Sequence, residues 1–138
     1  MEFTPGERNV KITLPDGGPL KFQVTRVKLN SIDQWKTMEL EISDEDAKQW
    51  EVFEDTAKPY GELPWSSKLS GTNLRVKIDD RTMFFDSKSE LTCSVPTPGS
   101  TVSCIIEIKS VYNFKGQSGL TTRAHQIKNY GSGWLGSS

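Results

Sequence analysis

The feature that most constrains the fold is an alternating stretch at residues 102–128, with the sequence VSCIIEIKSVYNFKGQSGLTTRAHQIK. Its first half is rich in β-branched residues that alternate with polar ones, KGQSG supplies turn residues, and LTTRAHQIK has the pattern of a return strand. Because side chains in a strand point alternately to two faces, this pattern predicts one long β-hairpin. We therefore expect a β-rich binding module rather than an enzyme.

Three other stretches alternate in the same way. Residues 8–30 contain two alternating runs around the turn residues PDGG, which predicts a second hairpin. Residues 34–43, QWKTMELEIS, alternate as a further strand. Residues 72–86, TNLRVKIDDRTMFFD, predict two strands around a turn at Asp79–Asp80. The chain should contain six to eight strands in antiparallel hairpins.

The period changes to that of a helix in the middle of the chain. Ser43 precedes the acidic run at 44–46, so it is placed to cap a helix whose first turn carries the acids. Apolar residues at helical spacing follow, and Pro59 ends the pattern. These signals predict one short helix at 44–57 and an irregular loop at 59–71.

Length and element order together suggest an architecture. A chain of 138 residues accommodates one domain, which we expect to span residues 1–129, with a flexible Gly/Ser-rich tail at 130–138. The predicted fold class is all-β with one short helix. A small antiparallel Greek-key barrel, OB-fold-like, suits these elements best, and a β-sandwich is the alternative.

Several function classes lack their usual signals. No apolar stretch is long enough to span a bilayer, and the N-terminus has no signal-peptide pattern, so we expect an intracellular protein that is not secreted and does not bind membranes. Cys93 and Cys104 match neither a zinc site nor a disulfide framework, so both should be reduced, with Cys104 in a strand core. His125 is the only histidine, and no nucleophile with a base is visible. We expect no enzymatic activity, no cofactor and no metal.

The charges are segregated along the chain, although the net charge is only −1. Residues 39–55 carry eight acids against one lysine, whereas residues 101–138 carry one acid, Glu107, against four basic residues. This distribution predicts an acidic surface and a separate basic one.

Basic and aromatic residues occur together on or near the predicted strands, which is the combination that binds single-stranded nucleic acid. Tyr112 and Phe114 are two apart, so they share a strand face that leads to Lys115 at the turn. Arg123 and His125 share a face of the return strand, with Ile127 next on that face. The full set of candidate nucleic-acid-binding residues is Arg75, Lys77, Phe84, Tyr112, Phe114, Lys115, Arg123, His125 and Lys128.

Each candidate also has a purely structural interpretation. Tyr112 and Phe114 could belong to a barrel core, and the lysines and arginines could be ordinary solvated surface. Phe84 and Phe85 point to opposite faces, so one should be core and the other exposed.

The four tryptophans have different expected environments. Trp35 should pack at a strand end and Trp50 under the helix, whereas Trp65 lies between loop breakers and is the aromatic least suited to a core. Trp134, in the tail, should pack on a partner or on the barrel.

Two segments carry a family resemblance. TNLRVKIDDRTMFFD followed by PGSTVSCIIEIKSVYNFKGQSGLTTRAHQIK resembles the C-terminal half of OB-fold single-stranded DNA-binding proteins from bacteriophages and large DNA viruses. In that family a Pro-Gly-Ser, an apolar strand, a Tyr/Trp-x-Phe/Asn step, a Gly-x-x-Gly-Leu turn and a basic strand ending in Gln-Ile-Lys/Val close the barrel.

The resemblance implies a non-catalytic protein that coats single-stranded DNA during replication, recombination or repair. It implies stacking at Tyr112 and Phe114 and phosphate contacts at Lys115, Arg123 and Lys128. Many phage members end in an acidic tail that recruits replication proteins, but this sequence ends in NYGSGWLGSS. Either that tail lies outside this sequence or the recruitment role is absent, unless the acidic helix substitutes.

Two functions therefore remain in view. The first is single-stranded DNA binding, with RNA as a second ligand because it also offers phosphates and stackable bases, and with a homodimer compatible with the sequence. The second is a β-rich protein-interaction or structural domain, such as a virion or assembly component, that uses the acidic segment 39–55.

Overall fold

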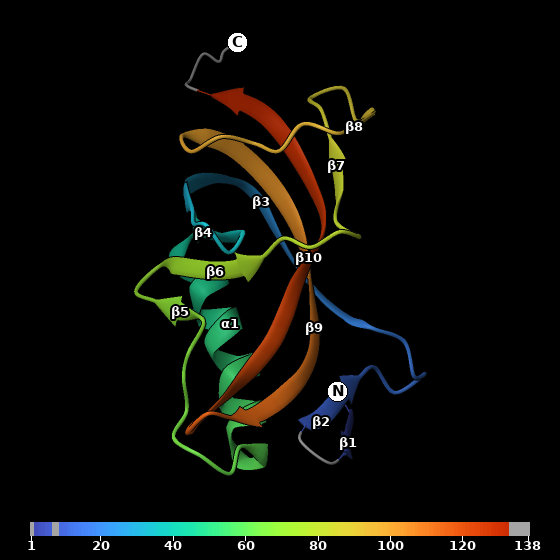
Figure 1. Cartoon of the computed structure of the whole chain (residues 1–138), viewed down its shortest axis with the longest axis vertical. Helices are drawn as coiled ribbons and strands as arrows, with labels where there is room; N and C mark the ends of the chain where they lie inside the picture. Colours follow the sequence, from blue (N-terminus) through green and yellow to red (C-terminus); the bar gives the residue numbers. More distant parts are fainter. Residues whose placement is uncertain (1, 7–8, 133–138) are drawn as a thin grey trace.

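The computed structural model describes residues 2–6 and 9–132 and is mostly β, with strands making up 55% (Figure 1). In these residues it has one α-helix, α1 (Asp44–Ala57), followed by the short 3-10 helix η1 (Lys58–Tyr60). The strands are β1 (Glu2–Pro5), β2 (Asn9–Thr13), β3 (Leu20–Ile32), β4 (Thr37–Glu41), β5 (Leu69–Ser70), β6 (Asn73–Lys77), β7 (Met83–Phe85), β8 (Leu91–Thr92), β9 (Ser100–Phe114) and β10 (Gln117–Ser132).

The predicted long hairpin is confirmed. β9 and β10 pair antiparallel from the Phe114–Gln117 pair at the tip to the Ser100–Ser132 pair at the base. Lys115 and Gly116 form the two-residue turn with φ of 51° and 81°, the positive values that match the right-handed twist of a hairpin. The return strand continues through Ser132, so the expectation of a flexible tail from residue 130 is wrong for 130–132. Residues 133–138, with Trp134, lie outside the described part of the chain.

The second predicted hairpin is wrong, although both of its strands form. β2 pairs with residues 110–112 of β9, and β3 pairs with residues 101–108 of the same strand. β9 is long enough to accept two partners end to end, and both runs bury apolar side chains against it. The turn residues after β2 therefore connect two strands that do not pair with each other.

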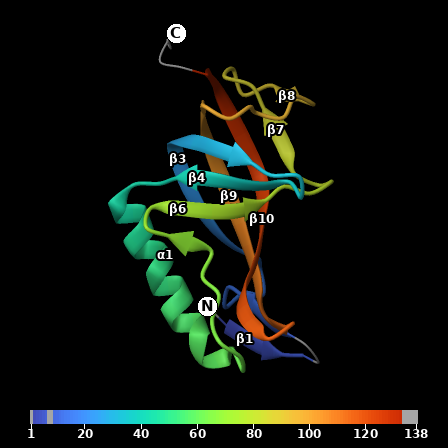
Figure 2. The same ribbon diagram turned by 60° about the vertical axis from the view of Figure 1, so that its left-hand side comes forward.

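The predicted helix is confirmed, including its bounds. The Ser43 hydroxyl accepts a hydrogen bond from the Asp46 backbone N–H at 3.1 Å, which satisfies one of the free donors of the first turn. The helix lies against one side of the curved sheet (Figure 2). Trp50 is completely buried there, and its ring and that of Phe22 lie nearly perpendicular at a centroid distance of 5.3 Å. The expected place of Trp50 under the helix is therefore confirmed.

The strands form one open sheet in the order β5-β6-β4-β3-β9-β10-β7-β8, with β1 and β2 joined through β9. β7 follows β6 in the chain, yet it pairs in parallel with β10 rather than with β6. The sheet is not closed, so a closed barrel is not confirmed. Cys104 is buried in the sheet, where burial raises the pKa of its thiol to about 12, and Cys93 is exposed. In the part of the chain that the structure describes, no helix has both the length and the apolar character needed to cross a bilayer.

Candidate nucleic-acid interface

A hollow of about 310 Å³ lies between β6 and the arm of the β9–β10 hairpin. β6 alternates as predicted, with Leu74 and Val76 fully buried and Arg75 and Lys77 exposed. The exposed pair lines the hollow together with Tyr112 of β9, so the structure brings three of the predicted residues to one surface. We call this hollow the β6 groove.

Tyr112 forms a wall of the β6 groove rather than part of the core. Its side chain is half-buried, and its hydroxyl accepts a hydrogen bond from the Gln117 amide at 3.3 Å. The Lys68 ammonium lies 5.4 Å from the centroid of the ring, within the range of a cation–π contact. The ring is therefore held in place while part of it still faces the groove.

Lys68 is a groove cation that the sequence patterns did not indicate. Burial and the neighbouring Arg75 guanidinium lower its pKa, against the opposing effect of Glu54. The Arg75 guanidinium donates to the Ser67 carbonyl at 2.9 Å, which holds the two cations near each other. Lys68 is partly buried and Arg75 is exposed beside it, so an anion that entered the groove would interact favourably with both cations.

The loop that carries Lys68 is held by a buried carboxylate. Glu54 is 4% exposed, and it accepts hydrogen bonds from the indole N–H groups of Trp50 and Trp65 at 2.8 and 3.1 Å. It also accepts the Lys68 backbone N–H at 3.0 Å. Trp65 is half-buried against the core, contrary to expectation, because α1 supplies an acceptor for its polar edge. Nothing in the local sequence signals this contact.

Trp35 is exposed, and the expectation that it packs at a strand end is wrong. Its side chain is 66% exposed at the turn between β3 and β4. The Asp33 carboxylate accepts the backbone N–H groups of Trp35 and Thr37, both at 2.9 Å, and so closes the turn with the indole directed to solvent. A second hollow at this turn is lined by Trp35, Lys36 and Lys77. Lys77 lines both hollows, so the two hollows adjoin at this residue.

We call this surface the basic track. Its members come from the β3–β4 turn, the loop before β5, strand β6 and strand β9, and they are Trp35, Lys36, Lys68, Arg75, Lys77 and Tyr112. Asp33 lies in the groove and Asp79 and Asp80 in the second hollow, so the track also has acidic neighbours.

Phe114 and Lys115 extend the hairpin beyond the β6 groove. Phe114 is 52% exposed, which excludes a core role, and the Lys115 ammonium lies 5.4 Å from its ring centroid. The pairing from Tyr112 to Phe114 has no irregularity, so both rings lie on one face of β9. An aromatic residue and a cation are thus available at the hairpin tip.

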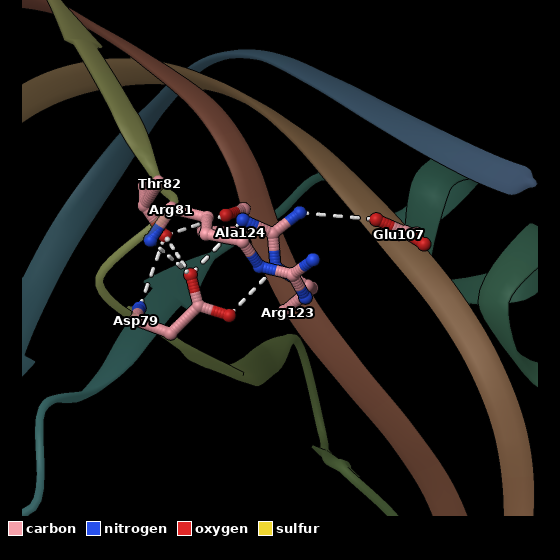
Figure 3. Close-up of polar contacts among 6 residues, drawn as sticks. All are labelled: Asp79, Arg81, Thr82, Glu107, Arg123 and Ala124. Carbon is pink, nitrogen blue, oxygen red and sulfur yellow. Dashed lines mark hydrogen bonds and ion pairs between the residues drawn. The ribbon is translucent and has the colours of Figure 1, made fainter.

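Arg123 is not available for phosphate, and its predicted role is wrong. It is 6% exposed, and its guanidinium bonds Asp79 at 2.7 and 2.9 Å and Glu107 at 3.0 Å (Figure 3). The guanidinium hydrogen bonds hold the pKa of Asp79 well below its usual range, and the same contacts raise the pKa of Arg123. The positive charge of Arg123 is therefore already neutralised.

The Asp79–Arg123–Glu107 cluster fastens the turn after β6 to strand β10. Next to it, the Thr82 hydroxyl donates to the Ala124 carbonyl at 2.6 Å and accepts the Asp79 backbone N–H at 3.0 Å. This turn covers the strand face that carries Arg123. The sequence had predicted that this face would be open to a ligand. We call this group of charges the ion cluster.

An irregularity in β10 separates His125 from its expected neighbours. Arg123 lies opposite Glu107, but the register then shifts by one residue, which leaves His125 without a partner on β9. After the shift Ile127 is fully buried, and Lys128 lies opposite Ser103. The expectation that Ile127 follows Arg123 and His125 on one face is wrong, because the bulge exchanges the two faces of the strand.

The remaining two candidates do not reach the β6 groove. Phe84 packs partly buried against the core, whereas Phe85 lines a different hollow near the end of β10. Lys128 lines that same hollow. Phe84 is therefore the core member of the pair.

In the described residues, no group of three His, Cys, Asp or Glu side chains is placed to hold a metal ion. Comparison with known proteins adds no family: no protein-family model, curated protein or solved structure matches the chain.

Proposed function

We propose that the protein is a non-catalytic single-stranded DNA-binding protein that holds an extended strand along the basic track. The observation that carries this proposal is that two hollows adjoining at Lys77 bring together cations and accessible aromatic residues. They are Lys68, Arg75, Lys77, Trp35 and Tyr112. A strand bound there would be coated and protected, as replication, recombination or repair requires.

The chemistry of the track matches the chemistry of an unpaired strand. Each nucleotide supplies one phosphate for a lysine or arginine and one base whose flat face can stack on an aromatic ring. Stacking contributes roughly 1–3 kcal/mol per base, and it tolerates any base because each has a π-face. Neither contact reads base edges or the ribose, so we expect little sequence preference and some binding of RNA.

An OB-type relationship is part of the same proposal. β6 and β10 approach each other without pairing, and the β6 groove lies between them. One helix follows β4 and covers the core, while the long strands β9 and β10 curve along the whole molecule (Figure 1). These features suit an OB-type barrel that is opened between β6 and β10, with the ligand at the opening.

The direct test is the fluorescence anisotropy of a labelled oligo-dT strand at about 50 mM salt, where phosphate contacts are strong. The double variant Arg75→Gln/Lys77→Gln should weaken binding at least about tenfold, because two phosphate contacts are lost. The matched control Lys48→Gln/Lys88→Gln removes the same charge from exposed positions on α1 and in the β7–β8 turn, and it should bind as the wild type does. Absence of binding by the wild type, or equal loss in both double variants, would refute the proposal.

The alternative function, protein interaction through the acidic segment 39–55, is favoured by one observation. Val52 is 63% exposed on α1, close in sequence to the exposed acids Glu51 and Asp55. An apolar side chain among acids suits a basic, partly apolar partner surface, including that of a replication protein. Reversal of Glu45 and Glu51 to lysine would abolish such a complex and leave oligo-dT binding intact. Loss of oligo-dT binding in that variant would argue against separate surfaces.

A further inference from the structure

A separate hollow of about 300 Å³ lies beyond the ion cluster, toward the C-terminal end of β10. We call it the β10 pocket. The members that matter here come from β3, β7, β9 and β10, and they are Gln23, Phe85, Ser103, Gln126, Lys128 and Tyr130. None of them belongs to the basic track.

Strand register places these side chains in two rows on one face of the sheet. Phe85 lies opposite Lys128, which lies opposite Ser103, so the first row crosses β7, β10 and β9. Gln126 and Gln23 both lie opposite Ile105 of β9, which forms the second row. Neighbouring strands are about 4.8 Å apart, so each row spans roughly 10 Å, the scale of one nucleotide.

The bulge at His125 creates this surface. Without the extra residue, Gln126 and Lys128 would occupy the positions on the core side of β10, and Ile127 would face outward. The shift by one residue buries Ile127 and turns the two polar side chains to the pocket. Bulges often redirect side chains in this way beside binding sites.

Tyr130 is held in position without any ligand. Its hydroxyl is hydrogen-bonded to the Ser103 hydroxyl at 3.1 Å, and the same Ser103 oxygen accepts the Arg26 backbone N–H at 3.0 Å. Arg26 has a φ of 51°, an uncommon left-handed conformation, and its guanidinium lies 4.4 Å from the Tyr130 ring centroid. The Lys128 ammonium lies 5.2 Å from the same centroid. Arg26 lies in the register irregularity of β3 between Val24 and Val27, and this bulge brings a second cation beside the fixed Tyr130 ring.

We propose that the β10 pocket binds a single mononucleotide unit. Phe85 offers aromatic surface for the base, and Tyr130 borders the pocket with Arg26 and Lys128 against its ring. The amides of Gln23 and Gln126 can each donate and accept at a base edge. Lys128 is the pocket cation for the phosphate. A volume of about 300 Å³ lies at the lower end of small-molecule sites, as suits one nucleotide. The unit could come from the end of a strand held in the basic track or from a free nucleotide, and its class as nucleotide rests on the proposed function.

The test is an amide NMR titration with dAMP, compared with deoxyadenosine and with inorganic phosphate. Residues 23–26 and 126–130 should shift and saturate with dAMP, which should bind at least about fivefold more tightly than either fragment, because base and phosphate contacts combine. Phe85→Leu and Lys128→Met should each weaken dAMP binding at least about fivefold, whereas Lys48→Met at an exposed position of α1 should not. Amide spectra of the variants report whether they are folded. Failure of dAMP to saturate these residues, or undiminished affinity in the folded variants, would overturn the inference.

Oligonucleotides separate the two sources and the two proposals. If the pocket holds a strand end, oligo-dT with a 5′-phosphate shifts residues 126–130 and the unphosphorylated strand does not. If only dAMP shifts them, the ligand is a free nucleotide. If oligo-dT binding depends on Arg75 and Lys77 but dAMP does not bind, the pocket proposal is wrong and the proposed function stands. If dAMP binding saturates but oligo-dT binding does not depend on Arg75 and Lys77, the proposed function is wrong and the pocket remains a nucleotide site.

Discussion

At the scale of single residues, neighbours decide what a charged side chain can do. Arg75 is exposed and donates to one backbone carbonyl, so most of its guanidinium is free for a ligand. Arg123 is the same residue type on a strand, yet two carboxylates, Asp79 and Glu107, occupy its donors. Arg123 is buried and its two partners are partly exposed, so removal of one carboxylate leaves a buried guanidinium that is only partly compensated.

The ion cluster makes a prediction about acid stability. The folded-state pKa of Asp79 is depressed below its ordinary value of 3.8, so its contribution to stability is present above that pH. It is lost as the pH falls below 3.8 and through the folded-state pKa. Asp79→Asn should lower the free energy of unfolding at pH 7 by roughly 1–2 kcal/mol, because the carboxylate is partly exposed and Glu107 still pairs with Arg123, and it should remove this part of the acid dependence.

Urea unfolding between neutral pH and about pH 2 measures the effect. Asp80→Asn, at the exposed neighbouring position, is the control and should behave as the wild type. An Asp79→Asn protein with wild-type stability at pH 7 would show that the cluster does not hold the turn.

Trp35 makes a prediction about binding at the same scale. Because its side chain is 66% exposed, Trp35→Ala should leave the thermal midpoint unchanged, yet it should weaken oligo-dT about tenfold through the loss of one stacking contact. Leu91→Ala, at a position that is 70% exposed in β8, controls for loss of surface apolar area. Equal oligo-dT affinities of the wild type and the Trp35→Ala variant would show that Trp35 does not contact the bound strand.

At the scale of elements, the bulge in β10 controls which residues face the ligand. Ideal alternation would keep Arg123, His125 and Ile127 on one side of the strand. The extra residue at His125 instead exchanges the faces, so the buried and exposed sets differ on either side of it. Both the core and the β10 pocket depend on this one irregularity.

Deletion of His125 tests that dependence. Without the extra residue, Gln126 and Lys128 would have to enter the core, and we expect the protein not to fold. His125→Ala keeps the residue count and should change the free energy of unfolding by less than about 1 kcal/mol. Circular dichroism and thermal melting distinguish these outcomes, and a deletion variant as stable as the wild type would show that the register can shift freely.

At the scale of the whole molecule, segregated charge allows a protein with a net charge of −1 to bind an anionic strand. Lys36, Lys68, Arg75 and Lys77 share the basic track, while eight acids belong to the segment 39–55. The local field at the track, rather than the total charge, should therefore govern binding.

Salt dependence measures that field. With four phosphate contacts, the logarithm of the oligo-dT affinity should fall with the logarithm of salt concentration with a slope of about −2.8, since each contact on a single strand contributes roughly −0.7. Arg75→Gln/Lys77→Gln should make the slope about 1.4 shallower. Anisotropy titrations across salt concentrations check this, and an unchanged slope in the double variant would mean that these side chains do not contact phosphate.

The sequence by itself determined the features that depend on local periodicity. The long hairpin, the helix at 44–57, the two faces of β6 and the burial of Cys104 all follow from spacing that a strand or helix imposes on its own residues. Of the candidate site, it identified the groove residues Arg75, Lys77 and Tyr112.

Only the tertiary structure decided how those elements pair and what covers them. β2 and β3 both pair with β9, and the bulge at His125 exchanges the faces of β10. Asp79 forms an ion pair with Arg123, which lies 44 positions later in the chain. The buried Glu54 carboxylate positions Lys68 by accepting its backbone N–H. Asp33 positions Trp35 by closing the turn between β3 and β4. Alternation indicates the side of a strand on which a residue lies. Which strands pair, and which segments cover a strand face, depend on contacts between segments distant in the chain, and no local pattern contains that information.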